Sequence, residues 1–148
     1  MKRSRAGFTL VEILIVVVIM AILAATIIPQ FSDSTKDAKT SSATFNLHTL
    51  RSQIELYKAQ HDGRLPSGTL VELYSRTNVS GTVGTSAATF PYGPYLRELP
   101  DNPFTKSATI KTITTDPAAT SDVTTTHGWI YSTTTGGLWI NDTTLITE

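Results

Sequence analysis

Apolar and polar positions divide the chain into three stretches, and the first two predict one long helix. An almost unbroken apolar run, 8–28, has about 20 residues, enough for a helix to cross a bilayer. A polar stretch, 32–39, follows it. Apolar residues then recur at spacings of four, three, four and three, as one face of an amphipathic helix does: Ala43, Leu47, Leu50, Ile54 and Tyr57. We expect a single helix from Phe8 to about Gln60, roughly 80 Å long. Its solvated face would carry Arg51, Glu55 and Lys58, and Gly63 would form its C-terminal cap.

The third stretch, at the C-terminal end, carries the clearest β signal. Gly128–Ser132 and Leu138–Asn141 are rich in aromatic and branched residues, and they flank a Thr- and Gly-rich turn, 133–137. This pattern predicts a β-hairpin. Its apolar face would lie on the Ala43–Tyr57 stripe. The expected fold class is therefore α+β, a long N-terminal helix packed by a small antiparallel sheet.

The segments between helix and hairpin give weaker signals. Leu70–Tyr74 predicts a short helix or turn. Ser75–Thr89 is rich in Gly, Ser, Thr and Ala and predicts an exposed loop. Prolines in 91–104 favour an extended chain with turns, and the Thr-rich segment 106–126 predicts a loop or weak edge strand.

One carboxylate, Glu12, lies inside the apolar run. A charge there costs about 2.5–3.5 kcal/mol on insertion scales unless it is paired or near an interface. An α-amine created by a cut between Gly7 and Phe8 would neutralise it. Three other interpretations explain less: a secretory signal peptide cut near Ala24-Ala25, an uncleaved single-pass anchor, and a buried soluble helix. None of the three accounts for both Glu12 and the basic flank before the run.

The basic segment Lys2–Gly7, followed by Phe8-Thr9-Leu10-Val11-Glu12, resembles the class III leader of type IV pilins and type II secretion pseudopilins. The resemblance implies that a prepilin peptidase cuts after Gly7 and methylates the new N-terminus at Phe8. It also implies that Glu12 pairs with the terminal amine of a neighbouring subunit, and that Pro29 is a helix kink. The implied domains are a leader (1–7), a transmembrane or filament-core helix (8–29), and a periplasmic pilin-like head (30–148).

Within this class, two features favour the major pseudopilin of a type II secretion system. The segment Pro91–Phe104 is similar to the one that precedes the sheet in major pseudopilins. The chain also has no cysteine, whereas many type IV pilins close a C-terminal loop with a disulfide. The resemblance then implies a structural subunit of a pseudopilus that helps to drive protein export across the outer membrane. Its partners would be copies of itself, prepilin peptidase, minor pseudopilins, an inner-membrane assembly platform and, before assembly, membrane lipid.

Two alternatives stay open. The chain would also suit a type IV pilin of a surface fibre for adhesion or motility. A membrane-tethered glycan-binding module would use three aromatic side chains as a stacking platform: Trp129, Tyr131 and Trp139. Aromatic residues at strand spacing are more often core, so this second alternative is the weaker one.

The charged residues of the chain predict where the protein lies in the cell and argue against nucleic acid as a partner. The chain has 12 basic and 12 acidic residues, and loss of Lys2, Arg3 and Arg5 with the leader leaves a side-chain balance of −3. This gives no basic footprint for nucleic acid. Basic residues before the apolar run predict a single-pass protein of the bacterial inner membrane, with a cytoplasmic N-terminus and a periplasmic head.

No residue pattern indicates catalysis, so we predict no enzyme. The three histidines, His48, His61 and His127, are widely separated and have no metal-ligand spacing. We expect His48 on the surface, His61 in the turn that ends the helix, and His127 at the start of a strand. No G-x-S-x-G stretch presents a nucleophile.

Calcium is the one cofactor that the family resemblance raises, because major pseudopilins commonly bind it through an acidic C-terminal loop. Oxygen donors suit this hard cation. The C-terminal region here offers a sparse set: Asp116, Asp122, Asn141, Asp142 and Glu148. We therefore assign no metal site and no cofactor.

Overall fold

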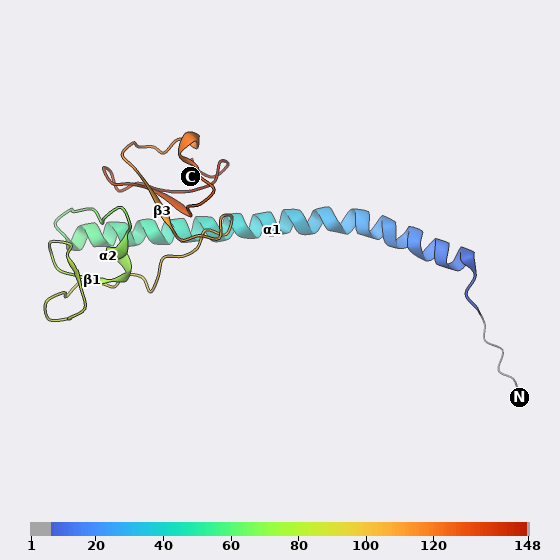
Figure 1. Cartoon of the computed structure of the whole chain (residues 1–148), viewed down its shortest axis with the longest axis horizontal. Helices are drawn as coiled ribbons and strands as arrows, with labels where there is room; N and C mark the ends of the chain where they lie inside the picture. The colour runs from blue at the N-terminus through green and yellow to red at the C-terminus, as the bar shows by residue number, and fades with distance from the viewer. Residues whose placement is uncertain (1–6, 148) are drawn as a thin grey trace, which may run out of the picture. The chain divides into compact units, whose positions relative to one another are not determined.

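The computed structural model describes residues 7–147, so the leader up to Ala6 and the candidate calcium donor Glu148 lie outside the described residues. The chain divides into two compact units, one up to Ala38 and one from Lys39 onward. Each is described here by itself. The predicted helix is present as α1, Leu10–Gln60, and it supplies the first unit and the spine of the second (Figure 1).

In the first unit, α1 begins two residues later than the pattern predicted, because Thr9 precedes it as a cap. The helix is assigned without interruption through Pro29. Proline lacks the amide hydrogen that would bond to the carbonyl four residues earlier. The kink at Pro29 stays a prediction.

In the second unit, α1 ends where the sequence predicted. The amide of Gly63 donates to the carbonyl oxygen of Lys58 at 2.9 Å, the long-range bond of a Schellman motif. Both Asp62 (φ 54°) and Gly63 (φ 78°) adopt the left-handed conformation. The sequence predicted a left-handed residue only at Gly63, and the turn uses Asp62 as well.

The apolar stripe of α1 is the centre of the core. All five predicted positions, Ala43, Leu47, Leu50, Ile54 and Tyr57, are at most 2% exposed. They pack in one cluster with Leu70 and Leu73 and with hairpin residues Trp129, Tyr131, Leu138 and Ile140. The prediction that the hairpin covers this stripe is confirmed.

The hairpin consists of β4, Trp129–Ser132, and β5, Leu138–Ile140, paired antiparallel with Trp129 opposite Ile140. Gly136 in the turn has φ 81°, as the Gly-Gly pair predicted. Both faces of the hairpin are buried, since Ile130 and Trp139 form a second cluster with Ile113, Ala118 and Ile146. The sequence predicted only one apolar face.

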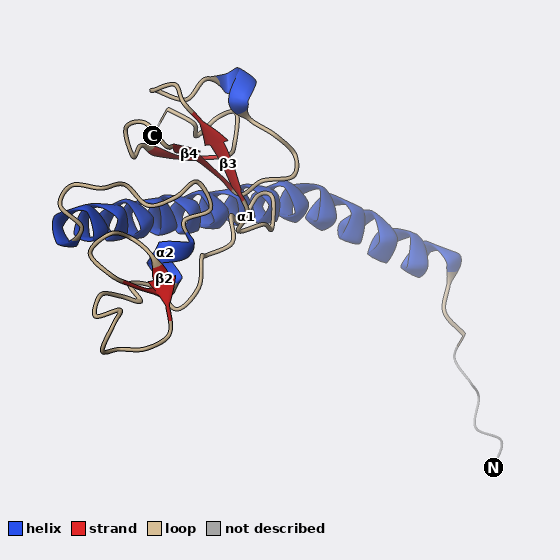
Figure 2. Ribbon diagram, turned by 60° about the vertical axis from the view of Figure 1, so that its left-hand side comes forward, coloured by secondary structure: helices blue, strands red, loops and turns tan. Residues whose placement is uncertain are grey.

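The main sheet is mixed rather than purely antiparallel. β3, Ile110–Ile113, is an edge strand and lies beside β4 (Figure 2), with which it pairs in parallel. The strand order in this sheet is β3-β4-β5. The edge strand was one of two outcomes predicted for 106–126, and its parallel direction was not foreseen. A parallel pair needs a crossover. The connecting chain includes the short 3₁₀ helix η1, Thr120–Asp122, whose last residue accepts a bond from Lys111 Nζ through its carbonyl oxygen at 2.6 Å.

The remaining elements surround the far end of the spine. α2, Val71–Tyr74, lies inside the segment predicted as a short helix or turn. β1, Arg76–Thr77, and β2, Val83–Gly84, form a two-stranded antiparallel sheet within 75–89. The prediction of an exposed loop there is wrong at Thr77, which is fully buried. Its hydroxyl oxygen lies 2.9 Å from Nε2 of His61.

The predicted solvated position of Arg51 is also wrong. Its side chain is half-buried, and Nε and Nη2 donate to the carbonyl oxygen of Leu138 at 3.0 and 2.8 Å. A long side chain at the edge of the apolar stripe reaches over it to the first residue of β5. The helix period alone does not predict such a bond to a distant strand.

Candidate functional site at the start of the apolar helix

The N-terminal end of α1 is closed by reciprocal hydrogen bonds between Thr9 and Glu12. The amide of Glu12 donates to Oγ1 of Thr9 at 3.2 Å, and the amide of Thr9 donates to Oε2 of Glu12 at 3.4 Å. This is a capping box, in which an N-cap hydroxyl and a carboxylate three residues later each bond to the other's backbone amide. The structure thus gives Glu12 a local partner within its own chain.

Thr9 is the residue of this site that the sequence analysis did not single out. Its signal was present, because Thr9-Leu10-Val11-Glu12 has the threonine-to-glutamate spacing of a capping box immediately before an apolar run. The helix dipole adds to the effect, since a carboxylate in the first turn meets partly positive amide groups. Thr9 and the helix end together hold the Glu12 carboxylate at one place on the helix.

The proposed cut site lies directly before this cap. Phe8 is 79% exposed, and a Cβ added at Gly7 would meet nothing within 4 Å. Nothing inside the described chain therefore requires glycine at position 7. Any requirement for it comes from outside the chain, as it would for a residue that an enzyme must fit.

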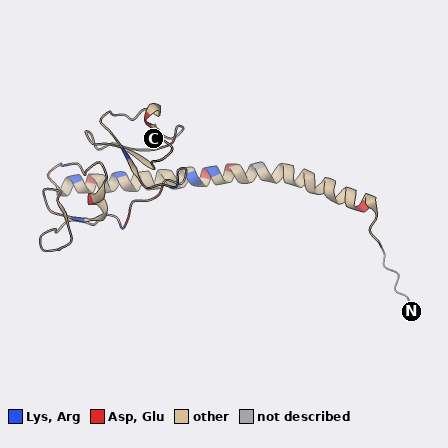
Figure 3. Ribbon diagram, viewed as in Figure 1, with Lys and Arg blue, Asp and Glu red and all other residues tan. Residues whose placement is uncertain are grey.

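The helix surface beyond Glu12 is apolar and exposed. No Lys, Arg, Asp or Glu occurs between Glu12 and Asp33, as the uninterrupted tan stretch in Figure 3 shows. Large apolar side chains along this stretch, such as Met20 (63%) and Ile28 (67%), are exposed. By length and composition this is the one candidate membrane-spanning helix among the described residues. Exposed apolar surface of this extent marks contact with a membrane or with other protein.

The three histidines lie apart from one another in the fold. His48 is exposed, whereas His61 is fully buried and stacked on Tyr57 with ring centroids 3.8 Å apart. His127 is half-buried just before β4, 2.9 Å from the Thr124 hydroxyl. In residues 7–147 no three His, Cys, Asp or Glu side chains group as a metal site would require.

The C-terminal oxygen donors considered for calcium serve local structure. The buried side chain of Asn141 donates to the carbonyl oxygen of Thr124 at 2.7 Å, and Asp142 Oδ1 accepts from the amide of Thr144 at 2.8 Å. The amide of Ala119 bonds to Asp122 and lowers the pKa of that carboxyl group. These bonds give Asn141, Asp142 and Asp122 local structural roles.

The aromatic platform required by a glycan-binding module is not on the surface. Trp129 and Tyr131 are fully buried, and Trp139 is 7% exposed. The indole Nε1 of Trp129 donates to the carbonyl oxygen of Pro100 at 2.8 Å, and the hydroxyl of Tyr131 donates to that of Pro66 at 3.1 Å. The three rings are core, so the glycan-binding interpretation is wrong.

A capped apolar helix with one carboxylate in its first turn, followed by an α+β head, defines a prepilin-like protein. In agreement, residues 2–28 match the family described as the prokaryotic N-terminal methylation motif. The type II secretion system core protein G of Dickeya chrysanthemi is 30% identical over 109 residues, 70% of this chain and 66% of that protein. The Klebsiella pneumoniae core protein G is 31% identical over 105 residues, which cover 70% of this chain and 71% of the relative. A fimbrial protein of Neisseria meningitidis is 35% identical over 82 residues, 55% of this chain and 48% of that protein.

The chain belongs to the family of type II secretion system core protein G, the major pseudopilins. No solved structure matches it. The predicted class, a pilin-like protein nearest the major pseudopilins, is confirmed.

Proposed function

We propose that this chain is the structural subunit of a type II secretion pseudopilus, matured by cleavage between Gly7 and Phe8 and by N-methylation of Phe8. One observation carries the proposal: a single carboxylate, Glu12, is held by Thr9 at the start of an otherwise apolar, exposed helix surface. A simple membrane anchor does not need a charge there, because Gln serves in a capping box as well as Glu. A filament subunit does, because the charge can select one position for its neighbour.

The cut places a positive amine at Phe8, directly before the cap residue Thr9 whose amide bonds to the Glu12 carboxylate. By this proposal the amine pairs with Glu12 of its own chain before assembly and with Glu12 of an adjacent copy in the filament. In a filament core the carboxylate is removed from water, and leaving it unpaired there costs several kcal/mol. Arrangements of neighbouring subunits that bring the amine and the carboxylate together are therefore favoured over arrangements that do not. Glu12 then sets the register between subunits.

Assembly transfers the helix 8–29 from lipid into a bundle of like helices. By this proposal the N-terminus is cytoplasmic and the head, 30–148, is periplasmic, as the basic leader predicts. A prepilin peptidase processes the precursor, an inner-membrane platform adds subunits, and minor pseudopilins join the filament. Pro29 supports a local loosening of the helix at the membrane edge, because it removes one backbone hydrogen bond.

The proposal is tested by deleting the gene in its host and restoring it with variants, while measuring exported protein in the medium and filaments sheared from cells. Glu12→Gln keeps the shape and removes the charge, so we expect a trimmed, membrane-inserted subunit that forms no filament. Asp33→Asn is the matched control, since it removes a carboxylate outside the apolar run. Normal export and filaments with Glu12→Gln would refute the register role.

A type IV pilin is the second candidate, and the similarity to a Neisseria fimbrial protein favours keeping it in the test. The deletion strain separates the two. Lost export with unchanged surface fibres supports the pseudopilus. Lost fibres with normal export would assign the chain to a fibre for adhesion or motility, with Glu12 in the same role.

A further inference from the structure

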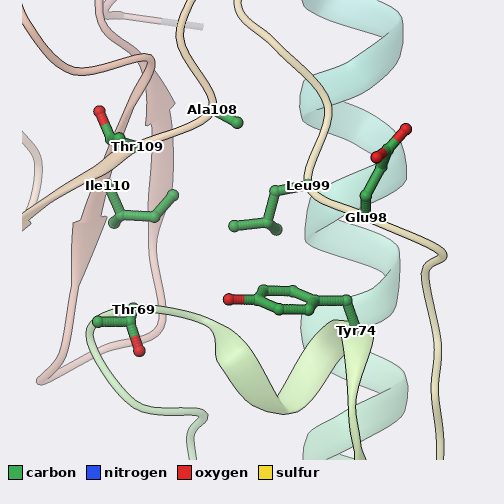
Figure 4. A pocket seen from close by; sticks show the side chains of 7 residues that line it. All are labelled: Thr69, Tyr74, Glu98, Leu99, Ala108, Thr109 and Ile110. Atoms are coloured by element: carbon green, nitrogen blue, oxygen red, sulfur yellow. The ribbon is translucent and has the colours of Figure 1, made fainter.

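The head carries an open apolar pocket that the proposed function does not use. It encloses about 460 Å³ between α2, the segment before β3 and the extended chain around Leu99. Figure 4 shows Tyr74, Leu99 and Ile110 turned toward one space, with Thr69 and Ala108 at its edge. A space of this size exceeds what one small side chain leaves and lies in the range of binding pockets, about 300–1,000 Å³.

The same head also carries an unpartnered aromatic side chain. Phe45 is 71% exposed, although its helix neighbours Ala43 and Leu47 are fully buried. Phe45 is two residues from each of these neighbours. Two residues along a helix turn the side chain by about 200°, so Phe45 points away from the stripe. The exposed phenylalanine of one copy can therefore fill the open apolar pocket of a second copy.

Phe45, called the knob below, and the pocket lie at similar positions along the axis of α1. Nδ2 of Asn46, next to Phe45, lies 3.4 Å from the carbonyl oxygen of Asp101. Leu99, which lines the pocket, is two residues before Asp101, within about 7 Å of chain. A neighbouring copy therefore needs only a small axial shift to bring its Phe45 to this level.

We propose that Phe45 of one copy inserts into the pocket formed by Tyr74, Leu99 and Ile110 of the next copy. Knob and pocket are different patches of the same head, so this contact is head-to-tail. When each copy is also shifted along the axis, such a contact cannot close into a ring, so it leaves a free Phe45 and a free pocket at the two ends and continues into an open filament. The inference rests on the proposed filament function and names the head residues that would join its subunits.

The natural absence of cysteine makes a direct test available. Phe45→Cys and Thr69→Cys are combined in the full chain, filaments are assembled in the host, and a short bis-maleimide linker is added. We expect a ladder of dimers, trimers and longer products on a denaturing gel. The matched control combines Phe45→Cys with Val79→Cys, an exposed site that does not line the pocket. Intact filaments with no ladder, or with equal ladders from both pairs, would overturn the proposal.

A second measurement covers the case in which the cysteine pair prevents assembly. Phe45→Ala should lower the filament yield by about tenfold or more, the change that accompanies the loss of one large buried apolar side chain. Leu56→Ala is the control, since Leu56 is a 44% exposed apolar residue of the same helix. Equal yields for the two variants would overturn the contact. If the unsubstituted chain forms no filament, the proposed function fails rather than this contact.

Discussion

Arg51 provides a sharp test of how the spine holds the hairpin. Its Nε and Nη2 both donate to one acceptor, the carbonyl oxygen of Leu138, from a half-buried position. A hydrogen bond to a charged group contributes about 1.5–3 kcal/mol, and two donors on one oxygen count as little more than one such bond. Loss of the packed aliphatic stem adds to this. Arg51→Ala should therefore lower the free energy of unfolding of the head by about 2–3 kcal/mol.

The assay is urea unfolding of the full chain in detergent, followed by tryptophan fluorescence. Both tryptophans, Trp129 and Trp139, are in the hairpin, so the signal reports on the head. Lys58→Ala is the matched control. It removes a 2.8 Å pair with Glu55, whose side chain is 67% exposed, and such surface pairs contribute about 0–1 kcal/mol. Equal midpoints for Arg51→Ala and Lys58→Ala would refute the assigned bond energy.

Three further outcomes are expected. Gly7→Leu should leave the leader attached, which mass spectrometry of the N-terminus would detect; a correctly trimmed Phe8 would contradict the processing proposal. Trp139→Ala should unfold the head without creating or abolishing glycan binding, which circular dichroism and a glycan-binding assay would check together; loss of saturable binding by a folded head would contradict the core assignment. Burial raises the pKa of Tyr57 to about 12, whereas an unfolded tyrosine ionises near 10. The unfolded chain therefore releases protons first, and stability should fall between pH 10 and about 12, less so in Tyr57→Phe; urea midpoints that are unchanged across this range would contradict it.

The one-dimensional pattern was sufficient wherever a structure depends on neighbours in the chain. The stripe from Ala43 to Tyr57 identified the buried face of α1 because a helix repeats every 3.6 residues whatever covers it. The turn after Gln60 and the hairpin near Gly136 followed from the same local rules. Glu12 was identified because a carboxylate in an apolar run is costly in any fold.

The pattern failed where a partner came from far along the chain. β3 pairs in parallel with β4, although 15 residues lie between Ile113, the last residue of β3, and Trp129, the first of β4. No local signal fixes the direction of such a pair. Thr77 is buried because His61 lies beside it. Both faces of the hairpin are covered because Ile146 and Ala118 return to it from other segments.

For this protein the sequence alone determined the long helix, its buried stripe and the hairpin, since each is set by residues within a few positions of one another. Tertiary structure decided the rest. It placed Arg51 on the carbonyl of Leu138, buried the three hairpin aromatics and opened a pocket beside Tyr74. The bond from Arg51 to Leu138 joins residues 87 positions apart, and the bond from Tyr131 to Pro66 joins residues 65 positions apart. Their geometry depends on how whole elements pack, because side chains from separate segments must fill one space at high density.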